Sequence, residues 1–238
     1  MTQNNILAIN TANEYLSLAL EVAGERFSFM AKVGNKQSQH IINEINTLLC
    51  KAQIKPNELD VIAYIEGPGS FTGLRVGLSV AMGIGLGAGT QLVPIPVFAL
   101  YAMVIKSQFN GNLVVGLDAR LNQIYLAGIN TQSLDYFIQP QVLDPEAIVL
   151  DRECSLVGDG FSIYHDRLVL LLQKHHLFNI DYPAANHMLD ILQMNKYALI
   201  EPHDANLLYL RNKVAKPLSE QMQNKLISGE SLDANAIS

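Results

Sequence analysis

A stretch near the N-terminus recurs in the middle of the chain, and this repeat limits the folds that the sequence can adopt. Fourteen residues, ILAINTANEYLSLA from Ile6, align with VVGLDARLNQIYLA from Val114, which places Asn10 opposite Asp118. In both copies a short apolar run leads into a polar stretch and then into a second apolar run, which is the pattern of a β-hairpin. We therefore expect an internal duplication.

The order of the predicted elements supports the duplication. In the first half we expect strands at residues 5–10, 15–22 and 26–32, a helix at 38–50, a strand at 60–65 and a long helix after a glycine-rich loop. In the second half we expect strands at residues 113–118, 123–129 and 134–138, a short helical stretch at 145–150, a strand at 155–157 and a helix at 161–174. Both halves are therefore βββαβα.

Two βββαβα halves in one chain describe the duplicated RNase H-like architecture of the actin, Hsp70 and sugar-kinase superfamily. We predict an α/β fold of two lobes, residues 1–108 and 109–238, of which the second is smaller and has a fraying tail after Pro217. In working members of this superfamily the nucleotide lies between the lobes, and the first hairpin turn of each lobe grips phosphates. The corresponding candidates here are Asn10, Thr11, Gly67, Ser70 and Asp118.

The segment EGPGSFTGLRVG (66–77) places four glycines between a predicted strand and a predicted helix. This context suits a phosphate-binding loop, because backbone N–H groups and the helix dipole favour anions at a helix N-terminus. The segment lacks the Lys-Ser/Thr of a P-loop, however, and no acidic residue follows about 20 residues later to hold a ribose. We therefore favour a packing role for these glycines over nucleotide binding.

Small residues recur at every fourth position from this loop onward: Gly69, Gly73, Gly77, Ala81, Gly85 and Gly89. They form a strip without side chains on one helical face, and each interior glycine costs ~1 kcal/mol relative to alanine, so another segment should pack closely on the strip. One hypothesis is a surface for a partner protein or a second copy of the chain, and the alternative is packing on the chain's own sheet. The residues predicted for the partner surface are His40, Ile41, Ile45, Leu48, Gly69, Gly73, Leu74, Gly77, Ala81 and Gly85.

Three charged residues lie at predicted turns or helix starts. For Arg75 and Arg120, salt bridges or carbonyl contacts are the common role, and contact with tRNA or a nucleotide is the alternative. Asp118 either orients a phosphate or caps its hairpin turn, and we favour the turn because Asp side chains commonly bond to the backbone two residues on.

The composition argues against several classes of function. Charged residues are 16% of the chain, against a usual share of roughly a quarter, so we expect a partner to cover part of the surface. A net charge of −6 argues against nucleic-acid binding by the chain alone. Two distant cysteines, no signal-peptide pattern and an apolar stretch at 76–89 that is short for a membrane span predict a cytoplasmic protein without a membrane role.

Several motifs together resemble the bacterial TsaB (YeaZ) family. They are GPGSFTGLRVGLSVAMGIG from Gly67, LAINTA near the start, LDARLNQIY around Asp118, LVGDG around Gly158 and LLYLR ending at Arg211. The matches extend from residue 5 to about residue 211, and GPGSFTGLR is highly specific. The resemblance implies a role in forming threonylcarbamoyladenosine beside the anticodon of tRNA.

The resemblance also implies partners. In this family TsaB is the non-catalytic partner of TsaD, a related protein that holds the metal and performs the transfer, and an ATPase, TsaE, completes the set. We therefore expect a heterodimer with TsaD, a ternary complex with TsaE, and a homodimer when the chain is alone. We expect contact with tRNA only through the complex.

The catalytic relatives carry a His-x-x-x-His metal pair after the shared loop and helix. In this chain Val97 and Tyr101 occupy the expected positions, and valine offers no donor to a metal. The first hairpin strand ends in Asn10, so that only Asp118 remains of a carboxylate pair. We expect a pseudo-enzyme scaffold without cofactor or metal; the alternative is an ATPase or metallopeptidase of the same superfamily acting on its own.

Overall fold

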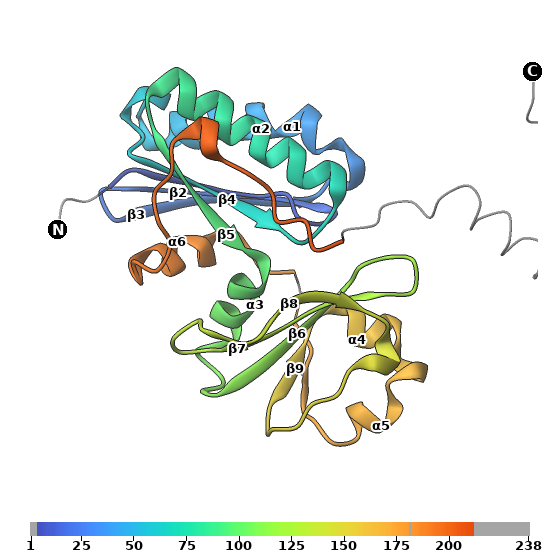
Figure 1. Cartoon of the computed structure of the whole chain (residues 1–238). Coiled ribbons are helices and arrows are strands. Elements are labelled where there is room, and N and C mark those ends of the chain that lie inside the picture. The colour runs from blue at the N-terminus through green and yellow to red at the C-terminus, as the bar shows by residue number, and fades with distance from the viewer. Residues whose placement is uncertain (1–3, 181, 212–238) are drawn as a thin grey trace, which may run out of the picture.

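The computed structural model describes residues 4–180 and 182–211, which form two lobes (Figure 1). The predicted tail after Pro217 lies outside the described residues. The first lobe is built from β1 (Ile6–Asn10), β2 (Tyr15–Val22), β3 (Glu25–Lys32), α1 (Gln37–Ala52), β4 (Val61–Gly67), α2 (Phe71–Ala88), β5 (Gln91–Pro96) and α3 (Val97–Ile105). The rest of the chain adds β6 (Asn112–Asp118), β7 (Ile124–Asn130), β8 (Tyr136–Leu143), β9 (Ser155–Val157), α4 (Asp159–Ile163), α5 (Val169–Leu172), β10 (Leu177–Phe178) and α6 (Asn186–Gln193).

The two five-stranded sheets share one topology, as the sequence repeat predicts. Their strand orders are β3-β2-β1-β4-β5 and β10-β9-β6-β7-β8, with an antiparallel meander followed by parallel strands in each. Asn10 ends β1 and Asp118 ends β6, so the aligned residues occupy equivalent positions. The prediction of a two-lobed α/β fold is confirmed.

The element order of each half extends beyond the predicted βββαβα. The first half continues with β5 and α3, whose apolar sequence shows no clear period because both are buried on most sides. In the second half, the predicted helix at 145–150 is only a 3₁₀ turn, Pro145–Ala147. The predicted helix at 161–174 is broken into α4 and α5 at Tyr164 and Leu168, whose φ angles are −103° and −118°. At this break the Tyr164 hydroxyl donates to Asp118 Oδ1 and Arg167 donates to the Asn122 carbonyl oxygen, both near the turn between β6 and β7.

Residues 182–211, here called the return segment, cross back to the first lobe. Ile200 pairs with Leu92 beside β5, and the Leu208 N–H donates to the Glu66 carbonyl oxygen at 2.8 Å. The predicted boundary at residue 108 places this segment in the second lobe, whereas most of its contacts are with the first. Figure 1 shows α6, which belongs to it, on the opposite face of the first sheet from α1 and α2.

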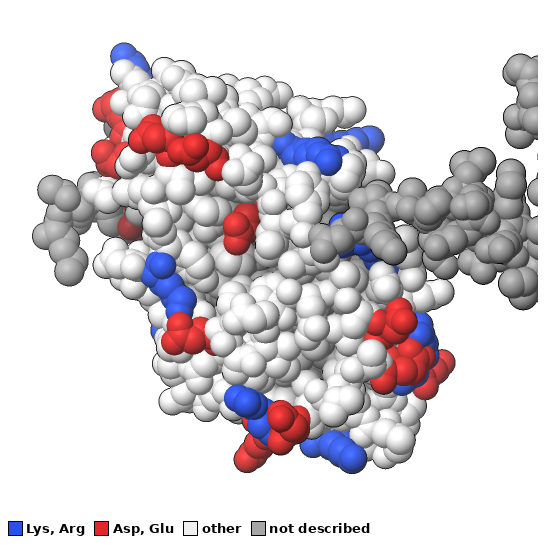
Figure 2. All heavy atoms as spheres, in the orientation of Figure 1, with Lys and Arg blue, Asp and Glu red and all other residues white. Residues whose placement is uncertain are grey.

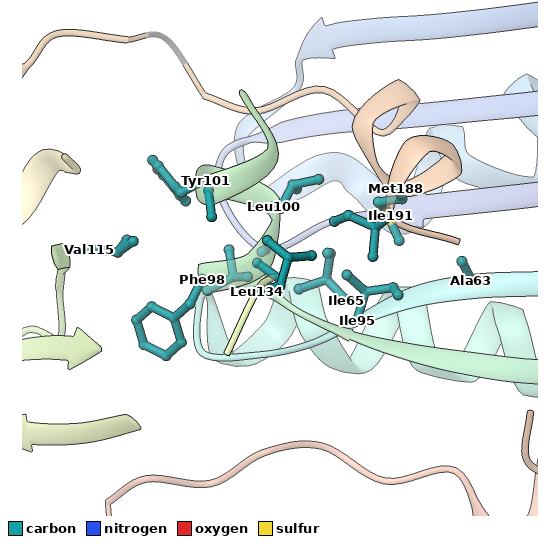
Figure 3. Packing of buried hydrophobic residues seen from close by; sticks show 14 of the residues in the cluster. Ala63, Ile65, Ile95, Phe98, Leu100, Tyr101, Val115, Leu134, Met188 and Ile191 are labelled. Atoms are coloured by element: carbon teal, nitrogen blue, oxygen red, sulfur yellow. The ribbon is translucent and has the colours of Figure 1, made fainter. Parts of the chain in front are cut away.

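One hydrophobic cluster joins the two lobes through α3. Phe98 and Leu100 on this helix are fully buried, and the cluster continues to Ile95 in the first sheet, to Val115 in the second and to Met188 on α6. Figure 3 shows these side chains converging from several elements. The shared core fixes the positions of the loops that surround the junction between the lobes.

A second hydrophobic cluster lies between the first sheet and helices α1 and α2, on the face of the sheet opposite to α6. Ile41, Ile45 and Leu48 line the buried face of α1 at helical spacing and are 1–2% exposed. Burial of side chains of this size contributes ~1.5–3 kcal/mol each. This packing places the opposite faces of α1 and α2 on the outside of the molecule.

Candidate functional site

The glycine strip of α2 packs on the chain's own first lobe. A Cβ added at Gly73 would lie 2.1 Å from the Thr11 carbonyl oxygen, and one at Gly77 would lie 2.3 Å from Thr11 Oγ1. One at Gly85 would lie 2.9 Å from the Thr90 carbonyl oxygen. The close approach that the strip predicts is therefore made within the chain, which is the alternative to the partner surface.

The predicted partner surface must be corrected accordingly. Most of its residues are buried against the first lobe: Ile41, Ile45, Leu48, Gly73, Leu74, Gly77, Ala81 and Gly85. A Cβ on Gly69, which is half-buried, would meet the Ala12 carbonyl oxygen at 2.5 Å, whereas His40 is exposed. Periodicity identified a packed helical face correctly but could not show which element covers it.

The outer faces of the same two helices enclose an apolar groove of ≈ 350 Å³. Its lining residues come from α1 and from the N-terminal half of α2: Ser38, Ile41, Ile42, Phe71, Thr72, Arg75, Val76, Ser79 and Val80. Ile42 is 48% exposed and Phe71 is 61% exposed, both high values for large apolar side chains. Sequence analysis missed this face, although a helix that is apolar all round and buries its glycine face must expose apolar side chains on the other.

By length and composition, α2 is also the one helix among the described residues that would suffice to cross a membrane, with a mean hydropathy of 1.4. The same composition occurs in helices that pack within or between proteins, and the glycine face of α2 is held against the first sheet. Of its residues 28% are buried and the others are half-buried or exposed, and the large apolar side chains of Phe71 and Leu86 are 61% and 64% exposed. This uncovered surface is the first candidate site.

The hairpin turn of the first lobe uses its polar groups within the chain. Asn10 is 3% exposed, accepts a hydrogen bond from the Ala12 N–H at 3.1 Å and donates one to the Pro183 carbonyl oxygen at 3.0 Å. The Ser70 N–H donates to the Ala12 carbonyl oxygen at 2.7 Å, and Ser70 Oγ caps α2 by accepting from the Gly73 N–H. The structure thus brings Asn10, Thr11, Gly67 and Ser70 together, and the Asn10 amide and the Ser70 N–H donate within the chain.

The equivalent turn of the second lobe is built around Asp118. Its Oδ1 accepts from the Arg120 N–H at 2.9 Å and from the Tyr164 hydroxyl at 2.8 Å. Its own N–H donates to Asp159 Oδ1 at 3.1 Å. The prediction that Asp118 caps its turn is confirmed, and the carboxylate pairs with Arg120 in a salt bridge of 3.2 Å.

The return segment lies across the junction of the lobes. A Cβ added at Gly67, where φ is +127°, would lie 3.1 Å from the Leu208 carbonyl oxygen. Asn206 exchanges two hydrogen bonds with the Tyr64 hydroxyl, and Arg211 reaches the turn of the second lobe. The chain itself therefore fills the space next to the glycine loop.

Acidic and phenolic groups also surround this junction. Burial raises the pKa of Glu66, and burial is likewise the main cause that raises the pKa of Asp159. The buried hydroxyls of Tyr136 and Tyr197 have no hydrogen-bond partner among the described residues. A buried carboxyl group on either lobe makes its surroundings unfavourable for a phosphate.

The positions of the expected metal pair are occupied by other side chains. Val97 and Tyr101 lie on the first turns of α3 and are 5% and 4% exposed, and burial raises the pKa of the Tyr101 hydroxyl. Within residues 4–180 and 182–211 no cluster of three His, Cys, Asp or Glu side chains is arranged to hold a metal ion. Only hydrophobic groups and one protonated phenol stand where imidazoles would bind.

These features define a class: a duplicated, two-lobed RNase H-like protein with a self-filled junction between its lobes and an uncovered apolar helix face. Comparisons with known proteins agree. The family model described as TsaD, tRNA N6-adenosine threonylcarbamoyltransferase, matches residues 31–225. The chain belongs to the TsaB (YeaZ) family, within the group of TsaD-related proteins that this model describes.

Individual relatives are similar over nearly their whole length. The tRNA threonylcarbamoyladenosine biosynthesis protein TsaB of Haemophilus influenzae is 28% identical, over 90% of this chain and 96% of that protein. TsaB of Escherichia coli is 29% identical, over 88% and 96% of the two chains. A solved structure of YeaZ from Pseudomonas aeruginosa has a TM-score of 0.77 at 22% identity, covering 87% of this chain and all of that one, and shows the same fold.

Proposed function

We propose that this chain is a non-catalytic scaffold subunit in the formation of threonylcarbamoyladenosine in tRNA, and that it binds and positions TsaD. The observation that carries the proposal is the apolar groove between α1 and α2, which exposes Ile42 and Phe71. The names of the similar proteins supply the pathway. We further propose a ternary complex with TsaE, formed in the cytoplasm.

The chemistry of the lobe junction supports a role without catalysis. One backbone N–H of each hairpin turn already donates within the chain, that of Ala12 to Asn10 and that of Arg120 to Asp118, and Leu208 lies against the glycine loop. Val97 and Tyr101 supply no metal ligand set. An ATPase acting alone would need free N–H donors in these turns, and a metallopeptidase would need metal ligands in place of Val97 and Tyr101.

The experiment is reconstitution of tRNA modification from TsaD, TsaE and the enzyme that makes the threonylcarbamoyl-adenylate, with and without this chain. An Ile42→Asp variant places a charge in the groove and should abolish binding of TsaD and the gain in modification. Leu170→Asp is the matched control, because Leu170 is 75% exposed on α5 in the other lobe. Equal loss in both variants, or loss in neither, would contradict docking at the groove.

A calorimetric titration of the isolated chain with Mg-ATP tests the alternative. We expect no saturable heat, because Asn10 and Asp118 each accept from an N–H of their own turn and Leu208 lies against the glycine loop. Tight binding followed by turnover would overturn the scaffold proposal. We also propose that the chain alone forms a homodimer. Sedimentation should show a dimer for the wild type and a monomer for Ile42→Asp if the groove forms the contact between the copies.

A further inference from the structure

One cation stands in the otherwise apolar surface of α2. This helix contains a single charged residue, Arg75, which lines the groove between α1 and α2. The Arg75 Cζ lies 3.3 Å from the centroid of the Phe71 ring, and its Nη2 donates to the Tyr209 hydroxyl at 3.1 Å. Phe71 and Tyr209 are 61% and 58% exposed, so the guanidinium is held between two rings at the surface.

Arg75 differs from the other arginines of the chain in its partners. Within residues 4–180 and 182–211 it forms no salt bridge with a carboxylate, whereas four others do: Arg26, Arg120, Arg152 and Arg167. Arg211 donates to carbonyl and amide oxygens instead. In Figure 2, blue side chains over the right of the first lobe are surrounded by white surface, while its red side chains gather at the left.

Covering this groove with an apolar partner would remove the Arg75 guanidinium from water. A desolvated cation is tolerated only when an anion or several acceptors satisfy it, and the Tyr209 hydroxyl is one neutral acceptor. Planar guanidinium groups bind carboxylates through two parallel hydrogen bonds, and they are enriched among the residues that dominate protein interfaces. No carboxylate among residues 4–180 and 182–211 pairs with Arg75, and we therefore assign the counter-charge to the protein that covers the groove.

We propose that Arg75, Phe71 and Tyr209 form an anchor that receives one Asp or Glu side chain from an apolar helix face of the partner. The inference rests on the proposed docking of TsaD at the groove and specifies what that face must carry. Within the anchor Arg75 makes the contact, and Tyr209 positions it from the return segment. The contact between the return segment and α2 thereby becomes part of the docking surface.

The test measures binding of TsaD to full-length variants by calorimetry at several salt concentrations. Arg75→Met keeps the apolar stem and should weaken binding about 10- to 100-fold while reducing its salt dependence. Arg75→Lys keeps the charge but loses the planar fork, so it should fall between the wild type and Arg75→Met. Tyr209→Phe keeps the ring but loses the hydrogen bond, and it should weaken binding less than Arg75→Met.

A charge exchange identifies the partner group. Arg75→Glu should abolish binding, and one Asp→Lys or Glu→Lys substitution on the partner's helix face should restore it. If Ile42→Asp abolishes binding while Arg75→Met leaves both affinity and salt dependence unchanged, the anchor is wrong and docking at the groove stands. If neither variant affects binding, the proposed function fails with it. If Arg75→Met breaks only self-association, the carboxylate belongs to a second copy and the proposal is overturned.

Discussion

The guanidinium of Arg211 donates from Nη2 to the carbonyl oxygens of Ala119 at 3.1 Å and of Arg120 at 3.4 Å, and so ties the return segment to the second lobe. The turn that it grips contains three consecutive non-glycine residues with positive φ, at +61° for Arg120, +51° for Leu121 and +60° for Asn122. Side chains rarely adopt this conformation, so surrounding contacts must hold the turn in place. The Asp118 carboxylate, which accepts from the Arg120 N–H, and Arg211 supply such contacts.

Replacing Arg211 should therefore destabilise the turn at residues 119–123 locally, without unfolding the second lobe. In Arg211→Ala the two carbonyl oxygens lose a charged donor, which costs about 1.5–3 kcal/mol for hydrogen bonds of this type. We expect faster amide hydrogen exchange at residues 119–123, with exchange in β1 and β2 unchanged. Arg211→Lys is the control for charge alone and should recover only part of the protection. Unchanged exchange in Arg211→Ala would show that the turn is held without the return segment.

Two glycines of α2 provide a matched pair for the packing argument. In Gly73→Ala the new Cβ meets the Thr11 carbonyl oxygen at 2.1 Å, a backbone atom that cannot move away cheaply, so we expect a loss of several kcal/mol or failure to fold. In Gly83→Ala the new Cβ has no atom within 4 Å, and the helix should gain up to ~1 kcal/mol. Thermal unfolding of the two variants, each as the isolated chain, measures the change in stability relative to the wild type. Similar melting temperatures for the two would contradict the assignment of the buried face.

This pair also shows how far the sequence could predict the structure. Spacing at i and i+4 correctly indicated that Gly73 and Gly77 share one packed face, but helix periodicity carries no information about the covering element. The covering group is the β1–β2 turn at Thr11, more than sixty residues away in the chain. The hairpins were predictable because two apolar runs around a polar stretch are a local pattern, and the pairing of Asn10 with Ser17 confirms the first hairpin.

The return segment could not be predicted for a related reason. Some of its contacts, such as the Leu208 N–H with the Glu66 carbonyl oxygen, are single backbone hydrogen bonds between distant residues. Such backbone bonds need no particular side chain, and the side-chain contacts of the segment, such as Arg211 with Ala119, leave no periodic pattern either. The anchor is an intermediate case: Phe71 and Arg75 are one helical turn apart in a specific motif, but Tyr209 joins them only through the fold.

The pH dependence of stability should contain a contribution from Glu66. Burial raises the pKa of this carboxyl group in the folded state, so the folded protein holds the proton more tightly than the unfolded chain does. The stability that the protonated group contributes is present below the unfolded pKa, about 4.3, and is lost as the pH rises through the folded value. Glu66→Gln removes this loss, so urea unfolding should show a gain over the wild type at pH 8 but not at pH 4. An equal effect at both pH values would contradict a titrating Glu66.

Restoring a carboxylate to the first hairpin turn should damage the fold. Asn10→Asp keeps the acceptor for the Ala12 N–H but replaces the amide donor to the Pro183 carbonyl oxygen with a second acceptor, at a side chain that is 3% exposed. A buried charge facing a carbonyl oxygen costs about 1–3 kcal/mol or more. Asn13→Asp in the same turn is the control, because the Asn13 side chain only accepts a hydrogen bond, from the Tyr15 N–H at 2.8 Å.

We expect urea unfolding to show a clear loss for Asn10→Asp and little change for Asn13→Asp. Comparable losses in the two variants would mean that the turn is sensitive to charge in general and that the Pro183 contact is unimportant. The expected result implies that the β1–β2 turn and the return segment stabilise each other through the bond between Asn10 and Pro183. A single substitution would then be unable to regain a phosphate-binding carboxylate, because the same atom position now holds the return segment on the first lobe.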